Sequence, residues 1–175
     1  RFTKSNYSHI AVVLKDPEFI HPSLKGYYIW ESSWEGKPDP QDGKIKLGVQ
    51  ITPLKEVLED YKDHRVIIRK INCNPLLFSN SKLSKVNEVV YDKPYDFKLL
   101  DWLFAYLRCN IIKSNKQFFC SAFVAFILMQ LNILNSKIDY DLVEPKDYDI
   151  KYSKYLNDYW TNKNIYSNQL IEIKK

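Results

Sequence analysis

Glycine, cysteine and histidine are scarce in this chain of 175 residues, which contains four, three and three of them. With so little glycine there is no glycine-rich loop to hold a phosphate, and the Gly-x-Ser-x-Gly turn of serine hydrolases is absent. The three cysteines are an odd number and fit no disulfide framework. This usage indicates a reducing, intracellular compartment: the cytoplasm, or a virion if the protein is viral.

Long apolar runs and clustered metal ligands are also missing. The longest apolar run, Ala122 to Met129, is much shorter than the roughly 18 residues of a membrane-spanning helix. No signal peptide is visible. His9, His21 and His64 lie far apart and no Cys-x-x-Cys pair occurs, so we expect no metal site. We expect no other cofactor.

Charge is present but is not concentrated. The net charge of +5 comes mainly from lysines scattered along the chain. No basic cluster is interleaved with aromatic residues, so we do not expect the protein to bind nucleic acid. The oligomeric state is left open by the sequence.

The pattern along the chain predicts a single α+β domain over residues 1–175. Alternation and β-branched content predict strands, and 3.6-residue periodicity predicts helices. Thr52 and Pro53 resemble the N-cap and first-turn proline of a helix. The expected strands are Tyr7–Leu14, Gly26–Ser32, Lys44–Ile51, His64–Ile71 and Gln169–Ile173, and the expected helices are Leu54–Tyr61, residues 79–92, a helix from Pro94, and Cys120–Leu131.

Cys120 opens the most hydrophobic of these helices, whose only other polar members are Ser121 and Gln130. A helix with so few polar residues is expected to be covered on nearly every side, at the centre of the fold. In the first turn, a thiol would face unpaired amide groups and the positive end of the helix dipole, which favour the thiolate. Cys120 is therefore a candidate nucleophile. The alternative is a small apolar core residue.

A nucleophilic cysteine requires a base and a group that orients the base. His9 is the best-placed histidine because it stands at the head of an otherwise apolar strand. Glu31 lies among large apolar side chains, where a carboxylate is costly unless it is paired. If the first two strands are antiparallel neighbours, Glu31 lies beside His9. The alternatives are an ordinary strand-end histidine and a carboxylate that points to solvent.

The order of these residues resembles the circularly permuted papain-like proteins. These are permuted relatives of the NlpC-type cysteine peptidases, grouped with YiiX-like proteins and related to lecithin:retinol acyltransferase. The resemblance is carried by Ser8–Val13, Trp30-Glu31-Ser32, a Tyr-Asp element at Lys93–Phe97, and Cys120-Ser121 opening a long helix. Where such proteins often have an acidic residue two positions after the cysteine, this chain has Ala122.

The resemblance implies a permuted papain-like fold and a cysteine hydrolase or acyltransferase that cleaves an amide or ester bond. Cys120 would attack the carbonyl, His9 would move protons, and Glu31 would orient His9. The backbone N–H of Cys120 would contribute to the oxyanion hole. Tyr95 and Trp30 are candidates for substrate binding, or else packing residues. The substrate would be a small molecule, a lipid or a peptide. The alternative is a catalytically silent protein of this fold that binds a lipid or peptide.

Overall fold

The computed structural model of the protein describes residues 7–91, 115–149, 154–162 and 166–173. They form a mixed α+β structure with small antiparallel sheets and several helices, which confirms the expected class. The strands are β1 (Val12–Lys15), β2 (Tyr27–Pro38), β3 (Ile45–Pro53), β4 (Val66–Ile71) and β5 (Tyr166–Ile173). The α-helices are α1 (Leu54–Asp60), α2 (Asn80–Tyr91), α4 (Asn115–Gln130) and α5 (Lys154–Asn157), and the 3₁₀ helices are η1 (Pro75–Phe78), η2 (Tyr140–Leu142) and η3 (Pro145–Tyr148).

β1, β2 and β3 form one antiparallel sheet in that order, and β4 pairs with β5 in a separate one. Val12 of β1 lies opposite Trp30 of β2, which in turn lies opposite Ile51 of β3. The β2–β3 connection closes at Gly43, whose φ of +72° favours glycine and whose N–H donates to the carbonyl of Asp39. β2 is therefore the central strand, covered on both edges.

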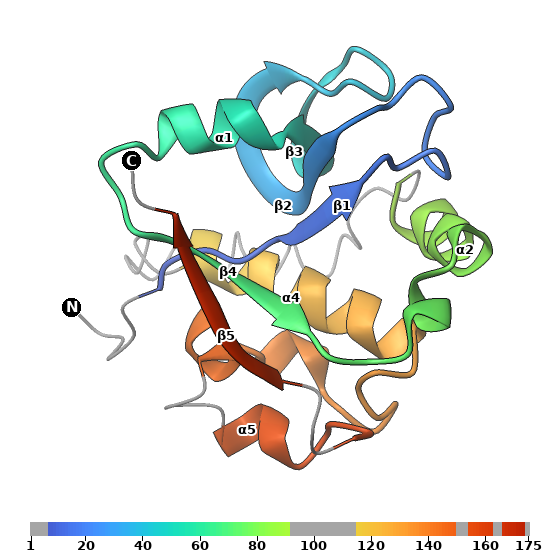
Figure 1. Cartoon of the computed structure of the whole chain (residues 1–175), viewed down its shortest axis with the longest axis vertical. Helices are drawn as coiled ribbons and strands as arrows, with labels where there is room; N and C mark the ends of the chain where they lie inside the picture. The colour runs from blue at the N-terminus through green and yellow to red at the C-terminus, as the bar shows by residue number, and fades with distance from the viewer. Residues whose placement is uncertain (1–6, 92–114, 150–153, 163–165, 174–175) are drawn as a thin grey trace, which may run out of the picture.

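α4 lies across the centre of the molecule, with β1–β3 and α1 on one side and η2, η3 and α5 on the other (Figure 1). Its described side chains from Cys120 to Val124 are all buried, and Ala125, Ile127 and Leu128 are almost inaccessible to solvent. The sequence prediction of a central helix covered on nearly every side is confirmed. The buried apolar side chains of α4 stabilise the fold by removing apolar surface from water.

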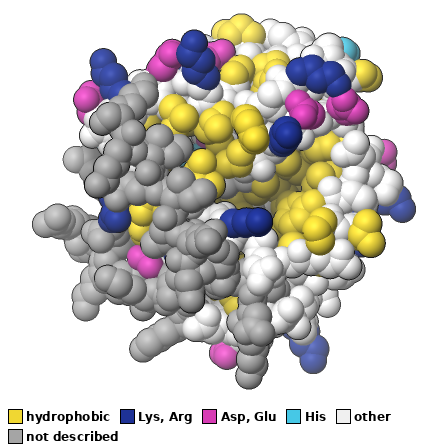
Figure 2. All heavy atoms as spheres, in the orientation of Figure 1, with side chains coloured by type: hydrophobic (Ala, Val, Ile, Leu, Met, Phe, Trp, Pro, Cys, Tyr) yellow, Lys and Arg dark blue, Asp and Glu magenta, His cyan; other side chains and the backbone are white. Residues whose placement is uncertain are grey.

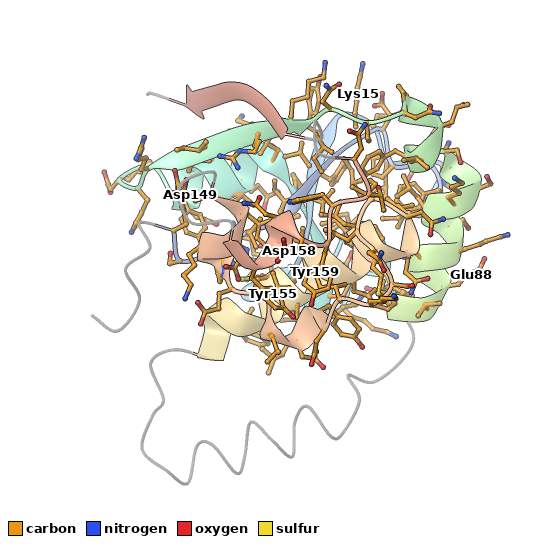
Figure 3. All side chains as sticks on the ribbon, turned by 90° about the horizontal axis from the view of Figure 1, so that it is seen from below. Lys15, Glu88, Asp149, Tyr155, Asp158 and Tyr159 are labelled. Atoms are coloured by element: carbon orange, nitrogen blue, oxygen red, sulfur yellow. The ribbon has the colours of Figure 1, made fainter. Side chains whose placement is uncertain are left out.

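The segment after α4 is tied back to the helix beside the cysteine. The hydroxyl of Ser121 donates to the carbonyl of Val143 at 2.5 Å, and the phenol of Tyr148 donates to the carbonyl of Ser121 at 2.9 Å. Further along, Tyr155 and Tyr159 lie together with ring centroids 5.3 Å apart (Figure 3). The two hydrogen bonds of Ser121 fix the position of this part of α4 relative to η2 and η3.

The β2–β3 hairpin continues past the core. Trp34 and Leu47 lie directly opposite one another and are 53% and 71% exposed. In the view of Figure 2, hydrophobic side chains are gathered over a broad area, interspersed with Lys and Arg side chains. The core ends before the tip of the hairpin, so the position of an aromatic residue along β2 decides whether it is buried.

Candidate active site

His9 and Glu31 meet because β1 and β2 are antiparallel neighbours. His9 lies three residues before the start of β1, and Glu31 lies in the middle of β2. Nε2 of His9 is 2.7 Å from Oε2 of Glu31. The His9 side chain is 26% exposed, whereas that of Glu31 is only 2% exposed. The first part of the expected strand, residues 7–11, is not strand, yet the pairing that follows it brings the two side chains together as predicted.

Glu31 has a second partner in β3. The hydroxyl of Thr52 donates to Oε1 of Glu31 at 3.4 Å, so the two carboxylate oxygens have different partners. Thr52 is 3% exposed. A buried carboxylate is costly unless it is paired and hydrogen-bonded. Its contacts with His9 and Thr52 offset that cost.

Cys120 completes the group from α4. Its side chain is fully buried, and it is hydrogen-bonded to His9. Burial lowers the pKa of His9, but the hydrogen bonds to Cys120 and Glu31 and the charges of both raise it more, to about 10. The structure therefore brings together all three residues that the sequence proposed for catalysis, and the imidazole carries its proton at neutral pH.

The position of Cys120 within its helix differs from the expectation. α4 begins at Asn115, so Cys120 is the sixth residue of the helix rather than the first. No proline or glycine in residues 115–119 stops the helix from extending in that direction. Only the first four N–H groups of a helix are unpaired. The expected effect of the helix terminus, and the use of the Cys120 N–H in an oxyanion hole, are therefore wrong for this structure. His9, rather than the helix terminus, is the group that contacts the sulfur here.

The two residues expected to bind substrate have different outcomes. Trp30 is 1% exposed, and its ring lies 5.4 Å from Phe123 of α4 and 5.8 Å from Phe19, measured between centroids. This packing supports the core interpretation of Trp30. Tyr95 lies outside the described residues.

Two residues near the site were not singled out from the sequence. Thr52 resembled a helix cap, but Pro53 holds the N-cap position of α1 without a side-chain hydrogen bond, and the Thr52 hydroxyl is used by Glu31. Strand alternation was an available signal, since Thr52 is two residues from Gln50, which pairs with Glu31. Tyr61, just after α1, is the second: burial raises its pKa, as do the charges of Glu35, Glu31, Asp60 and Cys120.

Access to the sulfur is restricted. Cys120 has no exposed surface, while the partly exposed ring of His9 forms the outer side of the group. A shallow groove of about 390 Å³ lies instead beside α1 and the start of β2, where Tyr27, Leu54 and Leu58 are among its lining residues. Any molecule that reacts with Cys120 therefore reaches it only when the groups around the sulfur move apart.

The chain matches no family model, no curated protein and no solved structure. Among the residues that the structure describes, no group of three or more His, Cys, Asp or Glu side chains is arranged to hold a metal ion. None of the described helices has the length and apolar character needed to cross a membrane.

Proposed function

We propose that this protein is a cysteine hydrolase or acyltransferase that cleaves an amide or ester bond. The observation that supports this most directly is the contact of His9 with both Cys120 and the buried carboxylate of Glu31. A cysteine nucleophile, a histidine and an acidic residue that orients the histidine are the groups that covalent acyl transfer requires. An imidazolium with a pKa of about 10 favours the thiolate form of a neighbouring sulfur at neutral pH.

Each residue has one role in the proposed reaction. The Cys120 thiolate attacks the substrate carbonyl and forms a C–S bond, and the carbonyl oxygen becomes an oxyanion. As the C–N or C–O bond breaks, His9 gives its proton to the leaving group. Neutral His9 then takes a proton from water or another acceptor, which attacks the thioester and releases Cys120. Glu31 holds the ring of His9 in place and stabilises its protonated form.

The permuted papain-like arrangement is part of the same proposal. It is supported by the chain order of His9, Glu31 and Cys120, by the antiparallel pairing of β1 with β2 that brings the first two together, and by a buried central helix carrying the third. The proposed site of action is a reducing compartment within a cell or virion, where the cysteine stays reduced. The proposed substrate is a small molecule, a lipid or a peptide.

The test is turnover of a panel of nitrophenyl esters and peptide anilides, with intact-mass analysis of the protein during the reaction. The proposal predicts release of the chromophore and an acyl adduct on Cys120. Cys120→Ala should abolish both, whereas the matched control Cys73→Ala should retain them, because burial raises the pKa of the Cys73 thiol and it has no part in the site. An adduct on Cys73, or full turnover by Cys120→Ala, would contradict the proposal.

The complete burial of Cys120 favours one second candidate: a catalytically silent protein of the same fold that binds a lipid or peptide. In that case the polar group around Glu31 would be retained for structure, and no acyl adduct would form with any ester in the panel. Ligand binding that is unchanged in Cys120→Ala, together with absence of turnover in the wild type, would favour the silent protein over the enzyme.

A further inference from the structure

The carboxylate of Glu31 is held at both of its oxygens. Oε2 lies 2.7 Å from Nε2 of His9, and Oε1 accepts from the hydroxyl of Thr52. Glu31 and Thr52 are only 2% and 3% exposed, so water has little access to replace either contact. Thr52 is the residue before Pro53, which caps α1 without help from a side chain. The Thr52 hydroxyl is therefore not required to cap α1.

We propose that Thr52 is a positioning residue of this site, whose hydroxyl keeps Glu31 aligned on His9. The inference rests on the proposed function and adds a fourth residue to it. The terminal torsion of a glutamate is broad, so a carboxylate held at only one oxygen can rotate. A second hydrogen bond restricts that rotation. Thr52 thereby acts on Cys120 through Glu31 and His9.

The neighbouring polar residues serve as an internal comparison. Gln50 lies directly opposite Glu31 and is as buried as Thr52, but its amide donates to the hydroxyl of Ser33 at 3.0 Å. Ser33 donates in turn to Oε1 of Glu35 at 2.8 Å. Ser33 therefore belongs to a polar chain on the same two strands, whose hydrogen bonds run to Gln50 and Glu35 rather than to His9 or Glu31. It provides a matched control for loss of a strand hydroxyl.

Among the residues that the structure describes, Glu31 acts directly on His9, which precedes β1, and on Tyr61, which follows α1. Cys120 on α4 also acts on His9 and Tyr61, and Glu35 on β2 and Asp60 on α1 act on Tyr61. The reactive form contains the imidazolium of His9 beside the sulfur of Cys120. Without the Thr52 donor, the carboxylate can rotate away from Nε2 of His9, and the imidazolium is then held less well beside Cys120. The reactivity of Cys120 should then fall off at a higher pH than in the wild type as the solution is acidified.

The experiment measures the rate of Cys120 alkylation by iodoacetamide against pH, with the site of modification read by peptide mass spectrometry. Thr52→Val keeps a branched side chain of similar size that suits a strand. In Thr52→Val, the pH below which the alkylation rate of Cys120 falls should rise by about half to one pH unit, the effect of losing one weak hydrogen bond to a charged group. This fall is the acid limb of the profile. Thr52→Ser, which keeps the hydroxyl, and Ser33→Ala should both follow the wild-type profile.

Each outcome decides one of two claims. If Cys120 of the wild type is alkylated no faster than Cys73, the proposed function fails before Thr52 is considered. If wild-type Cys120 reacts rapidly and Thr52→Val has the same acid limb, only the role of Thr52 is overturned. An equal shift in Ser33→Ala or Thr52→Ser also overturns it, because the effect would not depend on the hydroxyl at Glu31. If Thr52→Val does not fold, Thr52→Ala is measured with the same criteria.

Discussion

The substitution Glu31→Gln tests how much of the basicity of His9 comes from its buried carboxylate partner. Glutamine keeps the size of the side chain and removes its charge. The hydrogen bond between Nε2 of His9 and Oε2 of Glu31 is 2.7 Å long, and the carboxylate is almost fully buried. A hydrogen bond to a charged group contributes about 1.5–3 kcal/mol, so its loss should lower the pKa of His9 by about one to two units.

The assay is an NMR titration of the His9 ring, assigned by its absence in His9→Gln. The wild-type pKa is expected at about 10, and Glu31→Gln should bring it down while leaving it above 6.5, since the contact with Cys120 remains. Cys120→Ala should also lower it, because the hydrogen bond and charge of Cys120 raise the pKa of His9. With both partners removed, burial alone should hold the pKa below 6.5.

The control is Glu35→Gln, which neutralises a carboxylate four residues along β2 that bonds to Ser33 rather than to His9. It should leave the pKa of His9 close to the wild-type value. If Glu31→Gln leaves the His9 titration unchanged, or if Glu35→Gln lowers it as much, the reasoning from the contact between His9 and Glu31 is refuted.

Three further predictions concern stability. Trp30→Ala should destabilise the protein by about 3–5 kcal/mol in urea unfolding, because Trp30 is buried against α4. Trp34 is exposed, so Trp34→Ala should destabilise it by less than about 1 kcal/mol. Equal effects would contradict the core role of Trp30. Lys46→Met should lower the free energy of unfolding by about 3 kcal/mol, because it removes the cation 2.8 Å from the fully buried carboxylate of Asp39. Adding Asp39→Asn to the Lys46→Met protein should restore most of that loss. If it restores none, the proposed pairing of Lys46 with Asp39 is contradicted. The folded state raises the pKa of His9 from 6.5 to about 10, so its stabilising effect is complete below pH 6.5 and is lost as the pH rises through about 10. The free energies of unfolding of wild type and His9→Gln, measured in urea, should therefore converge over that range, from a difference of at most about 5 kcal/mol. A widening gap would contradict the direction of the pKa shift.

Much of the site was predictable because it depends on local signals. Alternation and β-branched residues identified the strands around His9 and Glu31, and the apolar run after Cys120 identified the central helix. A carboxylate among aromatic residues indicated a buried partner before its neighbour in space was known. Antiparallel pairing of consecutive strands is common enough that His9 and Glu31 were expected to meet.

Other features depended on partners that are distant in the sequence, which local patterns do not reveal. Thr52 has the residue type and position of a helix cap, but a buried carboxylate across the sheet is its partner. β2 was expected to end at Ser32 before a turn, yet it continues to Pro38 through an irregularity after Trp34, where Gly36 has a φ of +68°. Such a bulge keeps a glycine-containing segment within a strand. The pairing of β4 with β5 joins residues about a hundred positions apart, which no local pattern specifies.

The central claim is that His9 makes the sulfur of Cys120 reactive. The most direct measurement is the rate at which iodoacetamide modifies each cysteine at pH 6, in the wild type and in His9→Ala. We predict that Cys120 is modified much faster than Cys73 and Cys109 in the wild type, and that this advantage disappears in His9→Ala. Equal, slow modification of all three cysteines, or rapid modification of Cys120 without the imidazole, would contradict the account.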